Sequence, residues 1–256
     1  MSKQTIESLV TQSLCGFLGI LFLISTSNSA TLTATVTADN YYGLYYGSET
    51  SLTFVGRNEK GSAGNPGPYN WILPETFSNL PLSETDRLYI VQWNEGSGPA
   101  NTDWQALLGQ FVTSDGGLLV TNRSDWGYFL TSEPNPGSFG DTPSADALEV
   151  TIGSASWTPP GFSTPNGTGI WAHPSYTAPG GIDGITRQAD WISRTSDTDA
   201  TYFLTVYRSI PVSEIYGREI VTSTVAEPST VGILGIGIVV GFLINLRRND
   251  SARVIA

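Results

Sequence analysis

The chain has 256 residues, and it combines few charged residues, at 14%, with 28 glycines, 15 prolines and an aromatic content of 11%. This balance is typical of short strands joined by many turns and argues against a helical bundle. Residues 31–226 hold 20 acidic and 8 basic side chains, so this segment repels a phosphate backbone. We therefore expect no nucleic-acid partner.

Residues 1–29 have the layout of a signal peptide. Lys3 gives a basic start, and residues 16–24 form a short apolar run. Small side chains stand one and three positions before the expected cleavage site, which we place at Ser29 or Ala30. The apolar run is too short to span a bilayer, which argues against an uncleaved anchor.

Residues 30–215 form the predicted folded domain. From Thr31 to Thr37 apolar and polar side chains alternate, as in a half-buried strand. Runs that predict further strands recur along the domain and are separated by clusters of Gly, Pro, Asn and Asp. They cover residues 41–46, 52–55, 88–93, 107–112, 118–121, 126–130, 148–152, 191–193 and 202–208.

These short strands predict an all-β fold, an antiparallel β-sandwich of jelly-roll-like form, with a barrel as the main alternative. The only cysteine, Cys15, would be removed with the signal peptide, so packing alone must stabilise the domain. Residues 154–184 are rich in Gly, Pro, Ser and Thr, and we expect them to form a long surface excursion.

The start of the domain carries a resemblance to a known family. The segment Val36-Thr37-Ala38-Asp39-Asn40-Tyr41, followed by Leu44-Tyr45, is similar to the opening of galactose-binding-like jelly-roll domains. Those domains begin with an Asp-Asn turn that leads into an aromatic strand, and later segments of this chain follow in the same order. The resemblance implies a jelly-roll fold over residues 31–212, with a ligand at the loops of one end. It transfers no binding residue to this chain.

Residues suited to catalysis or metal binding are few. His173 is the only histidine, and we expect an exposed loop residue rather than a member of a catalytic triad. One imidazole and no thiolate make a zinc site unexpected. Asp39 with Asn40, and the segment Asp197-Thr198-Asp199, could offer oxygen ligands to calcium. Turns in which such side chains bond their own backbone are the simpler explanation. We expect no other cofactor.

Two sets of side chains could contact a sugar. Acidic residues near aromatic ones could act as a glycosidase pair, and the candidates are Glu75, Glu84, Glu95, Asp103 and Asp125. Exposed indole rings could stack on sugar rings, but a core position is the default expectation for Trp71, Trp93, Trp104 and Trp126. Of these four, we expect Trp104 to lie nearest the surface.

The end of the chain predicts a membrane segment. We expect residues 216–230 to form a linker, residues 231–246 a transmembrane helix and residues 247–256 a cytoplasmic basic tail. The helix is an apolar, Gly-rich run, and Arg247 and Arg248 follow it directly. Basic residues after a span stay cytoplasmic, which leaves the domain on the outer side. Both ends of the chain therefore predict the same exported topology.

The order of a short motif, an apolar helix and an arginine pair resembles the bacterial PEP-CTERM sorting signal. In that family the motif is Pro-Glu-Pro, so Glu227 and Pro228 match, with Ser229 following, while Ala226 replaces the first proline. The resemblance covers about the last thirty residues. It implies that an exosortase, a membrane protease, cuts near the motif and releases the domain to the cell surface or matrix. A membrane anchor that is never cut is the alternative.

Together these features predict an exported cell-surface or extracellular-matrix protein without catalytic activity. Its expected partners are an exosortase-type enzyme, the membrane through the C-terminal helix, and carbohydrate or another envelope polymer. A structural protein displayed without a specific ligand and a glycoside hydrolase are the alternatives.

Overall fold

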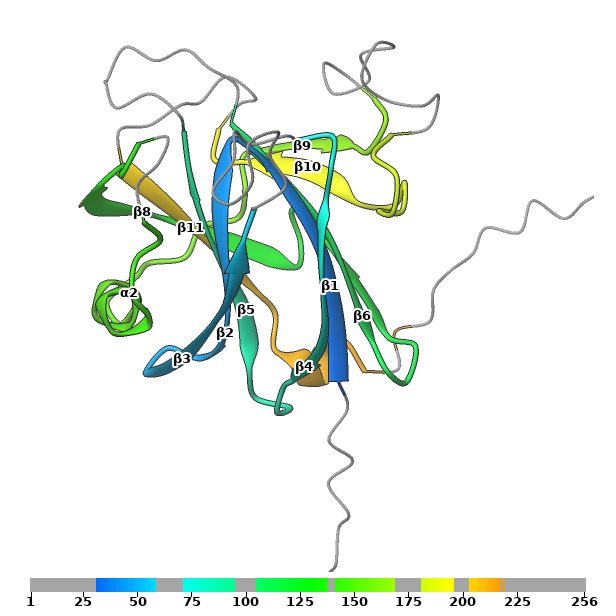
Figure 1. Cartoon of the computed structure of the whole chain (residues 1–256), viewed down its shortest axis with the longest axis horizontal. Coiled ribbons are helices and arrows are strands. Elements are labelled where there is room, and N and C mark those ends of the chain that lie inside the picture. Colours follow the sequence, from blue (N-terminus) through cyan, green and yellow to red (C-terminus); the bar gives the residue numbers. More distant parts are fainter. Residues whose placement is uncertain are drawn as a thin grey trace, which may run out of the picture. The chain divides into compact units, whose positions relative to one another are not determined.

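The computed structural model describes residues 31–58, 71–94, 105–137, 141–168, 181–195, 203–216 and 218. These residues form two antiparallel β-sheets packed face to face (Figure 1). The predicted β-sandwich is therefore confirmed. The two sheets have separate strand orders, which is the arrangement of a sandwich and not of the barrel that was its alternative.

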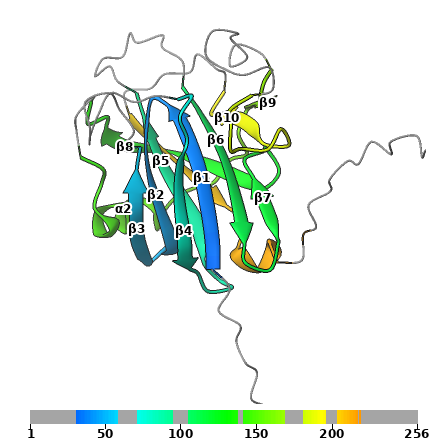
Figure 2. The ribbon, with the colours of Figure 1, turned by 45° about the vertical axis from the view of Figure 1, so that its right-hand side comes forward.

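Sheet A has the strand order β4-β1-β6-β10-β9, with β7 paired to β6. Figure 2 shows β4, β1 and β6 side by side. The longest pairing is that of β1 with β6, which runs from Leu32 opposite Thr113 to Asp39 opposite Ala106. The strands are β1 (Thr31–Asp39), β4 (Glu75–Pro81), β6 (Ala106–Thr113), β7 (Leu118–Val120), β9 (Phe162–Pro165) and β10 (Asp190–Ser193).

Sheet B has the strand order β3-β2-β5-β11-β8. The chain passes from sheet A to sheet B at Asp39 and Asn40, which are joined by a cis peptide bond. Most later connections also change sheet, so neighbours within a sheet are seldom consecutive in the chain. The strands are β2 (Tyr41–Ser48), β3 (Ser51–Arg57), β5 (Arg87–Trp93), β8 (Trp126–Pro134) and β11 (Phe203–Ser209).

The central core lies between the two sheets. Because side chains alternate between the faces of a strand, every second residue of β1, from Leu32 to Ala38, points into this core. Sheet B contributes its own alternate positions, among them Leu44 and Ile90. The central core therefore follows the period of two that the sequence predicts.

The outer faces of both sheets are also covered. On sheet B, the positions that alternate with the core bury Tyr41, Tyr45 and Tyr89 against the helix α2 (Ala145–Ile152). Figure 1 shows α2 beside β3 and β8. On sheet A, Leu108 and Trp191 pack against apolar side chains of residues 182–189 and of Trp71 and Ile72. Strands such as β2 are consequently buried on both faces.

One predicted strand is wrong. Residues 148–152 belong to α2, which Ser144 caps by accepting a hydrogen bond from the Ala147 amide at 3.2 Å. Leu148 and Ile152 stand four residues apart, and both face sheet B in the helix. A strand would have placed Val150 on their face, whereas Val150 is 81% exposed.

Two strands were not predicted, and one predicted loop is partly incorrect. Strand β4 forms the edge of sheet A beside β1. Strand β9 lies inside residues 154–184, which we expected to form a surface excursion throughout. The same segment buries Asn166 and Ile182 at 2% and 3% exposure, so its described parts belong to the folded domain.

The predicted targeting segments lie outside the described residues. This holds for the signal peptide with Ser29 and Ala30, for the transmembrane helix at residues 231–246 and for the basic tail at 247–256. Of the predicted linker at 216–230, only Tyr216 and Arg218 are described. Among the described residues, no helix is long and apolar enough to cross a membrane.

Candidate ligand-binding site

Buried amide side chains gather at one end of the sandwich, where β1 and β5 end and β2 and β6 begin, at the top of Figure 1. We call this end the upper end. The amides stand at or just beyond the strand ends, and each sheet contributes to the set. We call the set the upper-end cluster, and its members are the buried Asn40, Gln92, Asn94, Gln105 and Asn135 and the half-buried Asn58.

Gln92 joins the two sheets at the upper end. It lies in β5 at a position that alternates with the outward-facing Val91 and Trp93, so its side chain points between the sheets. Its Nε2 donates to the carbonyl of Asp39 at 3.1 Å and to that of Ala106 at 2.7 Å. Both acceptors belong to sheet A, and Gln92 is fully buried. Gln92 therefore fixes where the sheets meet beneath the cluster.

The connection between β1 and β2 is held by two asparagines. Asn58 donates from Nδ2 to the carbonyl of Asn40 at 2.9 Å and accepts from the Tyr42 amide at 3.1 Å. Asn40 donates to the carboxylate of Asp39 at 2.7 Å. These bonds fix the backbone at the point where the chain changes sheet.

Asn94 and Gln105 are the unusual members of the upper-end cluster. They are 1% and 2% exposed, yet in the described part of the chain no nitrogen or oxygen of either side chain has a hydrogen-bond partner. The Oε1 of Gln92 is equally without a donor there. Native proteins leave few buried polar groups unpaired, because each costs about 1–3 kcal/mol. Asn94 and Gln105 are therefore the candidates at this end of the sandwich for contact with a polar ligand.

The aromatic rings of Trp93 and Tyr41 and the guanidinium of Arg57 lie beside these amides. Trp93 stacks on Tyr41 with ring centroids 5.7 Å apart, and the guanidinium of Arg57 lies 5.5 Å from the Trp93 ring. The Trp93 indole donates to the carbonyl of Gly137 at 3.1 Å. Asn135 donates to the Asn94 carbonyl at 2.9 Å, which ties the end of β8 to the cluster.

A pocket of about 290 Å³ opens next to the end of β8, on the outer side of sheet B. Its walls combine apolar side chains of α2 and β11 with the carboxylates of Glu133 and Asp141. Pro134 and Pro136, which flank Asn135, line the same pocket. The pocket is therefore adjacent in the chain to the upper-end cluster.

Burial changes the acidity of Tyr45, which lies beneath the segment that leads into α2. Its hydroxyl donates to the carbonyl of Pro143, a residue of the pocket wall. Burial raises the pKa of Tyr45 to about 12, although a hydrogen bond with Thr142 and the charge of Arg57 each lower it in part. The phenol is therefore neutral at physiological pH and acts as a hydrogen-bond donor.

The structure describes three of the four predicted tryptophans and three of the five predicted acids. Trp93 and Trp126 are buried, which confirms their expected core positions, and Trp71 is half-buried. Glu75 begins β4 at the upper end, whereas Glu84 follows β4 at the other end. Glu75 and Glu84 therefore lie too far apart to form a glycosidase pair. Trp104, Glu95, Asp103, His173, Asp197 and Asp199 lie outside the described residues.

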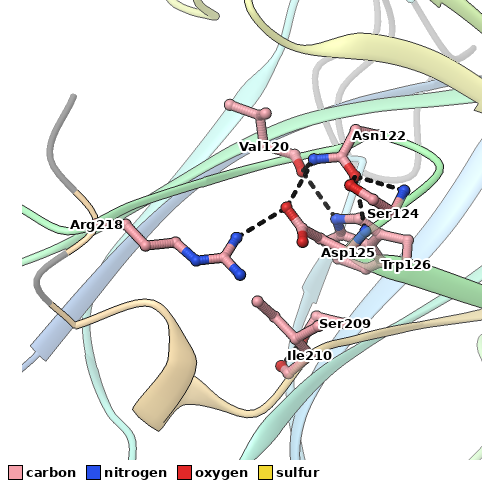
Figure 3. A network of polar contacts seen from close by, with 8 residues as sticks. All are labelled: Val120, Asn122, Ser124, Asp125, Trp126, Ser209, Ile210 and Arg218. Atoms are coloured by element: carbon pink, nitrogen blue, oxygen red, sulfur yellow. Dashed lines mark hydrogen bonds and ion pairs between the residues drawn. The ribbon is translucent and has the colours of Figure 1, made fainter. Parts of the chain in front are cut away.

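Asp125 has a structural partner, as Figure 3 shows. Its carboxylate receives Arg218 at 2.9 Å and the Asn122 amide at 2.8 Å. Asn122 in turn accepts from the backbone amides of Ser124 and Asp125, and Trp126 donates to the Val120 carbonyl at 3.0 Å. The network binds the turn between β7 and β8 to the last described residue of the chain.

The sorting residues Glu227, Pro228, Ser229, Arg247 and Arg248 lie outside the described residues. Asp39 is the candidate calcium ligand whose carboxylate is described, and that carboxylate accepts a hydrogen bond from the Asn40 side chain. Within the described ranges, no group of three or more His, Cys, Asp or Glu side chains could hold a metal ion.

Comparisons with protein-family models, with curated proteins and with solved structures find no match to the chain. What the described residues define is an antiparallel β-sandwich with a buried cluster of amides at its upper end. The two resemblances to families depend only on the residues quoted for them.

Proposed function

We propose that the protein is an exported cell-surface or extracellular-matrix protein whose β-sandwich binds carbohydrate or a similarly hydroxyl-rich envelope polymer without catalysis. The observation that carries the binding proposal is the pair of buried, unpartnered amides at the upper end, Asn94 and Gln105. A bound ligand would satisfy groups whose burial otherwise costs free energy.

The chemistry of the cluster favours hydroxyl groups as ligands. An amide offers both donors and acceptors, and a sugar hydroxyl can engage either. The neighbouring stack of Trp93 and Tyr41 is buried, so it supports the position of the amides and offers no open face to a sugar ring.

The strand order supports a jelly-roll form of the sandwich. Consecutive strands mostly change sheet, and neighbours such as β1 and β6 or β5 and β11 are far apart in the chain. Two intertwined Greek keys produce this kind of order. In the resembling galactose-binding-like domains the ligand meets one end of the sandwich, and the upper-end cluster lies at such an end.

Replacing Asn94 by leucine and Gln105 by methionine tests the binding proposal. Each change keeps the approximate volume of the side chain and removes its amide, so we expect at least a tenfold loss of binding on a glycan array of neutral and envelope polysaccharides. Thermal unfolding should stay at or above the wild-type temperature, because neither amide has a partner to lose among the described residues.

Gln188→Met serves as the matched control, because Gln188 is exposed outside the cluster. This variant should bind as the wild type does. If the wild-type chain binds no polysaccharide on the array, the binding proposal fails and display without a specific ligand becomes the better explanation.

The proposal of export and sorting is supported by the layout of the two chain ends. A signal peptide ending near Ser29 or Ala30 would direct export, and Glu227-Pro228-Ser229 with Arg247 and Arg248 would direct an exosortase. Intact-mass spectrometry of the exported protein should show a chain that lacks residues 231–256. A mass that still includes those residues would contradict processing and favour a permanent anchor.

A further inference from the structure

A second pocket, of about 180 Å³, lies at the opposite ends of β8 and β11 from the pocket described above. It lies where β8 begins, at Trp126 and Gly127, and where β11 ends, at Arg208 and Ser209. Arg87, at the start of β5, also lines it. We call it the arginine pocket.

Arg87 is the residue of this pocket that we expect to contact a ligand. Its NH1 donates to the carbonyl of Ser209 at 2.7 Å, and no carboxylate pairs with it among the described residues. Burial lowers the pKa of Arg87, and the nearby charge of Arg208 lowers it further. The charges of Tyr89, Glu214 and Glu49 raise it in part, so the net shift is downward. The net shift disfavours a positive charge at this position, and a bound anion would oppose that shift.

The other charges of the pocket already have partners. Arg208 pairs with Glu49 and lies over the Trp157 ring, with its guanidinium carbon 4.3 Å from the centroid. Asp125 pairs with Arg218 at 2.9 Å. Arg87 is thus the charged side chain of the pocket lining that forms no ion pair with a described residue.

A buried hydroxyl lies next to the same side chains. Tyr89 stands opposite Arg208 in the pairing of β5 with β11, and its ring packs 6.2 Å from that of Trp157. Tyr89 is fully buried, and in the described part of the chain its hydroxyl has no hydrogen-bond partner. An unpaired cation and an unpaired hydroxyl therefore occur together on one face of sheet B.

We propose that the arginine pocket binds the carboxylate of an acidic sugar, with Arg87 as the group that recognises the charge. A guanidinium holds a carboxylate through paired hydrogen bonds. The rim fits a sugar better than a peptide, because Trp157 and the exposed hydroxyl of Thr158 border the charge. This site is separate from the upper-end cluster and does not depend on the function proposed for it.

Isothermal titration of the full chain with glucuronic-acid oligomers tests the proposal, and neutral glucose oligomers of equal length serve as the comparison. We expect the acidic oligomers alone to bind at this site, with an affinity that falls as salt increases. Arg87→Gln should weaken binding at least tenfold. Arg123→Gln is the matched control, because Arg123 bonds the carbonyl of Pro160 and does not line the pocket.

Thr158→Glu provides a second test that leaves the hydrogen bond of Arg87 intact. Its side chain is exposed, so the change adds a negative charge at the rim and should also reduce binding at least tenfold. Asn94→Leu should leave this binding unchanged, which separates the two sites. Undiminished binding by both Arg87→Gln and Thr158→Glu would overturn the proposal. Equal binding of poly-glutamate would overturn the assignment of a sugar.

Discussion

Replacing Gln92 by methionine is expected to lower the free energy of unfolding by about 2–4 kcal/mol. The Gln92 amide donates to the carbonyls of Asp39 and Ala106, and both bonds are buried. Methionine has a similar shape but no donor, so two buried acceptors would lose this partner. Urea unfolding at neutral pH, followed by tryptophan fluorescence, measures the change.

Gln105→Met is the control for this prediction. Gln105 is as buried as Gln92, but among the described residues its side chain donates to nothing and accepts from nothing. Its replacement should leave the free energy of unfolding unchanged or raise it by about 1 kcal/mol. An equal loss in both variants would show that Gln105 has a structural partner, and it would remove the main argument for a ligand at the upper end.

Most strands can be predicted from the sequence because they are short runs rich in apolar and aromatic residues, bounded by turn-forming residues. Residues 148–152 mislead because Leu-Glu-Val-Thr-Ile both alternates and contains β-branched side chains, which favours a strand. The evidence for a helix lay just before this run, in Ser144 as an N-cap and Asp146 in the first turn. A sequence window that begins at Ser144 shows helical spacing, with Leu148 and Ile152 four residues apart on one face.

The two unpredicted strands lack the pattern on which a strand prediction depends. In β4 only Leu80 is buried, and Asn79 adopts a positive φ of 60°, where the pairing with β1 shifts register. Strand β9 has four residues, none of them fully buried, and it ends in proline. Edge strands of this kind are defined by the neighbour that they pair with, which a single sequence does not reveal.

The candidate site could be predicted only in part. A polar Gln92 within the apolar strand 88–93 was a local signal, because a buried amide in such a strand needs partners. Asn94 and Gln105 gave no comparable signal, since Asn and Gln are common beside turns. Their importance depends on burial and on missing partners, and both follow from the way two sheets meet.

Alkaline pH is expected to destabilise the domain through two buried phenols. Burial raises the pKa of both Tyr45 and Tyr89 to about 12, and the charge of Glu49 adds to the effect at Tyr89. The ordinary value is 10.0, so the unfolded chain ionises first as pH rises. The stability contributed by each neutral phenol is complete below pH 10 and is lost progressively between pH 10 and about pH 12.

A shift of about two pKa units corresponds to about 2–3 kcal/mol for each tyrosine when the loss is complete. Tyr89→Phe should remove about half of the combined loss and leave stability at neutral pH unchanged, because its hydroxyl has no partner in the described part of the chain. Tyr45→Phe should also reduce the alkaline loss, but it should cost about 1 kcal/mol at neutral pH by removing the bond to the Pro143 carbonyl. Urea unfolding of the three proteins at pH 8 and pH 11.5 distinguishes these effects. If both variants lost as much stability as the wild type, groups other than these phenols would control the alkaline transition.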